Sequence, residues 1–210
     1  LDNDSPRMQN VADQDVELEK SNVLLLGPSG TGKTLLASTL ARIVGVPFAI
    51  ADATTLTQAG YVGEDVDTII ARLLEQAEGN VDLAEWGIVY IDEIDKLART
   101  GETGQGTRDA SGERVQQALL KLVEGTRVKL NAKGGKKAGE QSVDTRNILF
   151  ICGGAFAGME RLLEKRLDTR ARGIGFHVDL SRSDASYEAC RLYELVQPDD
   201  LRHFGLIPEF

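Results

Sequence analysis

The chain has 210 residues, and its 24 lysine and arginine residues against 33 aspartate and glutamate residues give a formal net charge of −9. An acidic balance argues against a dedicated duplex-DNA binder, which needs a basic face, and 2 cysteines are too few for a disulfide scaffold or a zinc framework. No apolar run approaches the roughly 18 residues that a membrane helix requires, so we expect a globular protein of a reducing compartment.

Short apolar runs alternate with helical patterns along the chain. Strands are predicted where apolar runs stop at turn residues, over residues 22–26, 47–50, 88–91 and 148–152. Helices are predicted where apolar residues recur three or four positions apart, over residues 34–44, 66–77, 112–123 and 159–166. The first helical pattern consists of Leu35, Leu36, Leu40, Ile43 and Val44. Strands separated by helices favour right-handed crossovers, so the expected fold is α/β with a mostly parallel sheet between helices.

Two stretches interrupt this alternation. Residues 99–111 are rich in glycine and threonine and predict a mobile loop, whereas residues 128–143 predict a hairpin whose tip contains Lys133, Lys136 and Lys137. A last helical region is expected over residues 183–204. Trp86, just before the third predicted strand, is interpreted as a packing anchor.

The segment from Gly27 to Thr34, GPSGTGKT, fits the phosphate-loop pattern G-x-x-x-x-G-K-[ST] at every position. Glycines let several backbone N–H groups face one anion, and a helix that begins at Thr34 adds its N-terminal dipole. A glycine-rich turn with a chance lysine is the alternative, but this motif also follows a predicted strand and opens a predicted helix. Lys33 is expected to bind the β- and γ-phosphates and Thr34 to ligate Mg²⁺. The residues expected to contact the nucleotide are Pro28, Ser29, Gly30, Thr31, Gly32, Lys33, Thr34 and Leu35.

Asp92 and Glu93 follow the apolar strand predicted at residues 88–91. In phosphate-loop enzymes an aspartate at this point holds Mg²⁺, and a following glutamate polarises the attacking water. The alternative is a strand that ends in solvated acids. With Lys33, these two residues are the predicted catalytic groups. The guanine-recognition pattern Asn-Lys-x-Asp is absent from the sequence, so ATP hydrolysis coupled to mechanical work is favoured over a GTPase.

These two motifs together resemble the AAA+ ATPases. Intervening sequences narrow the resemblance to the ClpX family of protein unfoldases that feed the ClpP peptidase: ATTLTQAGYVGED (53–65), YIDEIDK (90–96), VQQALLK (115–121), ILFICGGAF (148–156) and GLIPEF (205–210). The resemblance runs from about residue 16 to the end. It implies an N-terminal flank over residues 1–20, a P-loop NTPase large domain over residues 21–182, and a helical region over residues 183–210 that leads to a small domain.

The resemblance also implies functional loops. Gly60, Tyr61, Val62 and Gly63 match the pore loop in which an aromatic residue grips unfolded polypeptide inside a hexamer, and Lys136 and Lys137 match a second pore loop that lacks the family's histidine. Ile174, Gly175 and Phe176 match the tripeptide that docks on ClpP. The implied partners are ClpP, unfolded or tagged proteins and five further copies of the chain, without nucleic acid or membrane. The implied cofactors are ATP and Mg²⁺ without zinc, and the implied location is cytoplasmic of the bacterial type or the mitochondrial matrix.

Several features depart from the family pattern. Arg114 stands where the family has glycine, and Gly153 and Gly154 stand where many AAA+ proteins have a polar sensor residue. The family's zinc-binding domain, its arginine finger just after Phe210 and its small domain lie outside this sequence. Because an arginine finger contributes about 10³-fold or more to hydrolysis, a fragment with weak binding and slow turnover is expected. An AAA+ motor acting on nucleic acid and a nucleotide-binding module with little turnover remain the alternatives.

Overall fold

The structure, a computed structural model, describes residues 20–57, 64–98, 110–131, 140–174 and 192–207. Its centre is a four-stranded sheet in the order β1-β8-β5-β2, formed by β1 (Val23–Leu26), β8 (Leu149–Gly154), β5 (Ile88–Asp92) and β2 (Phe48–Asp52). All three strand pairings are parallel. The carboxyl ends of the four strands therefore meet at one edge of the sheet, which is where ligands bind in open α/β folds.

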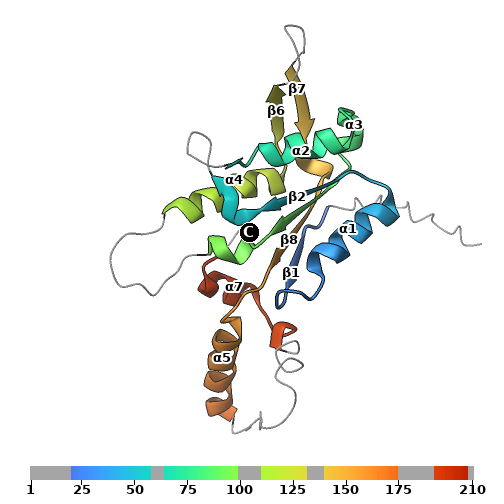
Figure 1. The fold of residues 1–210 in the computed structure, drawn as a ribbon. Coiled ribbons are helices and arrows are strands. Elements are labelled where there is room, and N and C mark those ends of the chain that lie inside the picture. The colour runs from blue at the N-terminus through green and yellow to red at the C-terminus, as the bar shows by residue number, and fades with distance from the viewer. Residues whose placement is uncertain (1–19, 58–63, 99–109, 132–139, 175–191, 208–210) are drawn as a thin grey trace, which may run out of the picture.

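Helices cover both faces of this sheet (Figure 1). On one face, Ile88 and Tyr90 of β5 form a small apolar cluster with α1 (Lys33–Val44). On the other face, Val89 and Ile91 belong to a larger cluster with α2 (Thr68–Gln76) and α4 (Ala110–Glu124). This alternation follows from the two-residue period of a strand, and it makes β5 apolar on both sides. The predicted α/β fold with a mostly parallel sheet is confirmed.

The face of α1 that packs on the sheet carries its small residues and not its large apolar ones. Ala37 and Ala41 are each 1 % exposed and face the sheet, whereas Leu36 is 61 % and Ile43 77 % exposed. Small side chains let the helix axis approach the strands closely.

The interpretation of Trp86 as a packing anchor is wrong, since this residue is 65 % exposed. The short helix α3 (Val81–Ala84), which precedes it, buries Ala84 instead.

The remaining elements connect and extend this core. Two further pairs of strands are the parallel β3 and β4 and the antiparallel hairpin of β6 and β7. Three 3₁₀ helices and the helices α5 and α7 also lie in the described part of the chain, and the predicted helix at residues 159–166 extends further, to Ile174. The bounds are η1 (Ala53–Thr55), β3 (Leu56–Thr57), β4 (Glu64–Asp65), η2 (Ile94–Leu97), β6 (Arg127–Asn131), β7 (Glu140–Asp144), η3 (Thr145–Asn147), α5 (Met159–Ile174) and α7 (Pro198–Phe204).

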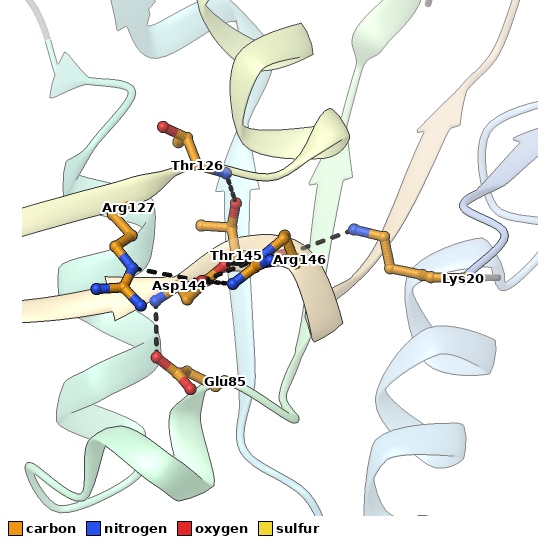
Figure 2. A network of polar contacts seen from close by, with 7 residues as sticks. All are labelled: Lys20, Glu85, Thr126, Arg127, Asp144, Thr145 and Arg146. Carbon is orange, nitrogen blue, oxygen red and sulfur yellow. Dashed lines mark hydrogen bonds and ion pairs between the residues drawn. The ribbon is translucent and has the colours of Figure 1, made fainter. Parts of the chain in front are cut away.

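A polar network holds the base of the β6–β7 hairpin (Figure 2). Arg146 Nε donates one hydrogen bond shared by the two carboxylate oxygens of Asp144, each 3.0 Å away, and Arg146 Nη2 donates to Asp144 Oδ2 over 2.6 Å. The backbone N–H of Asp144 donates to Glu85, next to α3, over 2.8 Å. Thr145 accepts from the backbone of Thr126 over 2.8 Å, and Lys20 Nζ donates to the Thr145 carbonyl over 3.4 Å. The hairpin is thereby joined to α3 and to the residues before β1.

Two contacts fasten α7 to the rest of the chain. The rings of Phe156 and Phe204 lie 5.2 Å apart, and Arg166 of α5 forms an ion pair with Asp200 over 2.9 Å. Asp200 also accepts a hydrogen bond from the backbone of Gln197 and so caps α7.

Within the part of the chain that the structure describes, no helix has both the length and the apolar character needed to cross a membrane.

Candidate nucleotide-binding site

The loop between β1 and α1 has the backbone that a phosphate-binding loop needs. Gly30 and Gly32 have φ angles of 83° and 88°, in the left-handed region that favours glycine. A Cβ atom at either position would meet nothing within 4 Å, so backbone conformation and not space requires glycine there. The backbone N–H of Gly27 donates to the Gly154 carbonyl over 3.3 Å and fixes the loop to the end of β8. The exposed loop thus presents its backbone, and the start of α1, to an anion.

Lys33 lies over this loop. Its Nζ donates to the carbonyl oxygens of Gly27 over 2.6 Å and Pro28 over 3.0 Å. Thr31 Oγ1 also donates to the Pro28 carbonyl, over 2.9 Å. An ammonium group has three N–H donors, and Lys33 uses two of them to hold the loop together.

Thr34 and Asp92 join the phosphate loop to the end of β5. Thr34 Oγ1 donates to Asp92 Oδ2 over 3.2 Å, across 58 residues of sequence. The other carboxylate oxygen, Oδ1, accepts from the Tyr90 hydroxyl over 3.2 Å and from the Glu93 backbone N–H over 2.9 Å. Hydroxyl and carboxylate oxygens are the ligands that Mg²⁺ prefers. The two side chains therefore fit the metal that the resemblance implies.

Glu93 follows Asp92 in an unusual backbone conformation. Its φ of 56° lies in the left-handed region, which a residue other than glycine rarely adopts. This conformation ends β5 and lets η2 begin at the next residue, while the Glu93 side chain remains exposed at the carboxyl edge of the sheet. The Glu93 carboxylate is therefore accessible to solvent.

Asp95 fixes the segment after Glu93 to the neighbouring strand. Its side chain is 4 % exposed, and Oδ1 accepts from the backbone N–H of Ala155 over 3.2 Å. A Cβ atom on Gly154 would lie 2.6 Å from the same oxygen. Gly154 is therefore needed for the close approach of η2 to β8, which is a structural reason for glycine where many AAA+ proteins have a polar residue.

The structure brings together only part of the predicted functional set. Lys33, Thr34 and Asp92 lie at one place, with Glu93 beside them. Ile174 is the last residue of α5. Eight predicted residues lie outside the described part of the chain: Gly60, Tyr61, Val62, Gly63, Lys136, Lys137, Gly175 and Phe176.

Sequence reasoning did not single out Tyr90 as a site residue. Its hydroxyl contacts Asp92, and its side chain is fully buried. Its spacing from Asp92 could have indicated this contact, because residues two apart on a strand point to the same face.

A hollow of about 410 Å³ lies elsewhere, at the other end of α1. It is lined by Ser38, Ala41, Arg42, Gly45, Val46, Pro47, Phe48, Gln76 and Leu83. None of the predicted site residues lines it.

Comparison with known families decides the class of this site. Residues 18–210 match the family model described as AAA domain (Cdc48 subfamily). The chain belongs to the AAA domain family. It is an AAA ATPase domain of the P-loop type, in agreement with the parallel sheet and the phosphate loop.

ClpX proteins are among the relatives that the chain matches. The chain is 60 % identical over 204 residues to the ATP-dependent Clp protease ATP-binding subunit ClpX 3 of Methylococcus capsulatus, covering 95 % of this chain and 47 % of that protein. It is 61 % identical over 199 residues to ClpX of Azotobacter vinelandii, covering 94 % and 45 %, and 56 % identical over 209 residues to ClpX of Treponema denticola, covering 98 % and 48 %. The chain therefore spans about half the length of the curated relatives it matches, and the resemblance to the ClpX family is confirmed.

Proposed function

We propose that this AAA domain binds ATP with Mg²⁺ at the junction of the phosphate loop and β5, and hydrolyses it. The observation that carries this proposal is the 3.2 Å hydrogen bond between Thr34 and Asp92. It brings a hydroxyl and a carboxylate from two distant segments to one point, next to the lysine and the backbone N–H groups that suit phosphate.

Each side chain has a distinct task in this reaction. When bound, Mg²⁺ would supply positive charge that stabilises the phosphate oxygens. Lys33 binds phosphate oxygens, and Thr34 and Asp92 provide oxygen ligands. Glu93 orients the attacking water and accepts its proton as the water oxygen bonds to the γ-phosphorus and the bond to the ADP oxygen breaks.

The ClpX relatives suggest what hydrolysis drives. In the proposed function, this chain unfolds proteins as a homo-hexamer and passes them to the ClpP peptidase in a bacterial-type cytoplasm. Tyr61 grips substrate, Lys136 and Lys137 line a second pore loop, and the segment that begins at Ile174 docks on ClpP. Support comes from the described flanks. Leu56 pairs with Glu64 on either side of residues 58–63, and Asn131 pairs with Glu140 on either side of residues 132–139, so both loops begin and end on paired strands.

The decisive experiment measures ATP turnover by the full-length protein and its Glu93→Gln variant. General-base catalysis contributes about 10²- to 10⁴-fold, so turnover should fall by that factor while nucleotide binding persists. Glu75→Gln is the matched control, because Glu75 is exposed on α2, away from the phosphate loop, and it should hydrolyse ATP at the parent rate. Equal turnover by the parent and Glu93→Gln would refute the role of Glu93. A parent that binds nucleotide without turnover would indicate a nucleotide-binding module.

A further inference from the structure

We infer that Tyr90 is a positioning residue for the Mg²⁺ ligand Asp92, an inference that rests on the proposed function. Its hydroxyl and the Glu93 backbone N–H both donate to Asp92 Oδ1, whereas Asp92 Oδ2 accepts from Thr34. The two oxygens of one carboxylate thus have different partners. Tyr90 holds Oδ1 on the protein side, and this orientation directs Oδ2 to the phosphate loop.

The fold explains how a strand residue reaches this carboxylate. Tyr90 and Asp92 are two residues apart on β5, so both point to the face covered by α1, the helix that contains Thr34 in its first turn. Tyr90 is fully buried among Ala37, Ala41 and neighbouring strand residues. A tyrosine packed on all sides has one position for its hydroxyl, and a buried hydroxyl requires a hydrogen-bond partner. Asp92 Oδ1 accepts the hydrogen bond that this hydroxyl donates.

The adjacent strand leaves room for this hydroxyl. A Cβ atom on Gly153 would lie 2.0 Å from Tyr90 Oη and 2.7 Å from Cζ. Any side chain at this position of β8 would therefore displace the tyrosine ring. Gly153 stands where many AAA+ proteins have a polar residue. In this chain the Tyr90 hydroxyl occupies the space that a side chain at position 153 would fill.

The test measures metal binding directly, by electron paramagnetic resonance of Mn²⁺ titrated into the full-length protein with saturating ADP. Residues that orient metal ligands typically change metal affinity by about 10- to 100-fold, so Tyr90→Phe should weaken Mn²⁺ binding about tenfold. In turnover assays the same variant should need more Mg²⁺ for half-maximal ATP hydrolysis and approach the parent rate at saturating Mg²⁺. A residue that only packs the core would not alter this metal dependence.

Tyr193→Phe is the matched control. Its hydroxyl also donates to a carboxylate, Glu160 Oε1, over 2.7 Å, and it has no contact with Asp92 among the described hydrogen bonds. Tyr193→Phe should bind Mn²⁺ as the parent does. If a folded Tyr90→Phe variant binds Mn²⁺ as tightly as the parent, the positioning role of Tyr90 is overturned and the proposed function stands. If the parent itself binds no Mn²⁺ with ADP, the positioning role and the proposed function are both overturned.

A second variant keeps the inference testable if Tyr90→Phe is poorly folded. Gly153→Ala forces the Tyr90 ring away from Asp92, so it should also weaken Mn²⁺ binding. In the Tyr90→Phe background, where the hydroxyl is already absent, Gly153→Ala should cause little further loss of Mn²⁺ affinity. Additive losses in the double variant would overturn the proposed route from Gly153 through Tyr90 to Asp92.

Discussion

The carboxamide of Gln116 accepts a hydrogen bond from the backbone N–H of Ile207 over 2.8 Å, across 91 residues of sequence. The same side chain donates from Nε2 to the Leu97 carbonyl over 2.7 Å, and it is fully buried. Gln116 therefore links η2, which follows the proposed catalytic glutamate, to the segment after α7. A buried amide with both ends paired specifies how these two segments meet.

Replacing Gln116 by leucine should destabilise the domain by about 2 kcal/mol, because the Leu97 carbonyl and the Ile207 N–H lose their partner. Urea unfolding followed by circular dichroism measures the effect. Gln117→Leu is the control, since Gln117 is the exposed neighbour on α4. Equal unfolding midpoints for the two variants would show that the buried hydrogen bonds contribute nothing.

Removing the charge of Asp144 should lower stability only where this carboxyl is ionised. Its hydrogen bonds with the Arg146 side chain lower the pKa of Asp144 from 3.8 to about 2. With a lowered pKa in the folded state, the stabilising contribution is present above pH 3.8 and is lost as the pH falls through 2. The urea midpoints of the parent and Asp144→Asn should therefore differ at pH 6 and converge toward pH 2. In the Arg146→Gln background the difference at pH 6 should shrink; a difference that stays constant with pH would contradict this account.

The thiol of Cys152 should resist alkylation in the folded protein. Burial raises its pKa to about 12, and only the thiolate reacts. In a Cys190→Ser variant, iodoacetamide at pH 8 should leave the native chain unmodified in mass spectrometry and modify it completely in urea. Rapid modification without urea would show that β8 opens readily.

Lys33→Ala should weaken nucleotide binding by about 10- to 100-fold, since a hydrogen bond to a charged group contributes about 1.5–3 kcal/mol. Titration of a fluorescent ADP analogue measures the dissociation constant. Lys121→Ala removes an exposed lysine from α4 and should leave binding unchanged. If both variants bind ADP equally well, the phosphate loop does not hold the nucleotide through Lys33.

Tyr61→Ala should uncouple hydrolysis from substrate handling in the full-length protein. ClpP-dependent degradation of a tagged substrate should fall at least about tenfold, which corresponds to about 1.4 kcal/mol, while ATP turnover continues. Trp86→Ala truncates another aromatic residue, one that is 65 % exposed, and should degrade substrate normally. Undiminished degradation by Tyr61→Ala would remove this residue from the proposed pore loop.

Much of the fold follows from local pattern. The four strands of the main sheet and helices α1, α2 and α4 lie within a few residues of their predicted positions, because apolar runs and helical spacing are local properties. The extension of α5 to Ile174 was not predicted, although Leu167, Ala171 and Ile174 recur at helical spacing, because Gly173 and the polar residues between them weaken the pattern. Its first half is held in place by contacts such as the ion pair between Arg166 and Asp200, which joins residues distant in sequence.

The phosphate loop, the acidic end of β5 and the family could be predicted from sequence, because each depends on residue types at fixed spacing. Tertiary structure alone decided which surfaces meet. It placed Ala37 and Ala41 against the sheet and left Trp86 exposed, since close packing selects side chains by the space between elements. It also brought the Tyr90 hydroxyl beside Gly153. A hydrogen bond or a clash depends on atoms from separate strands, and their distance is set only when the whole sheet has formed.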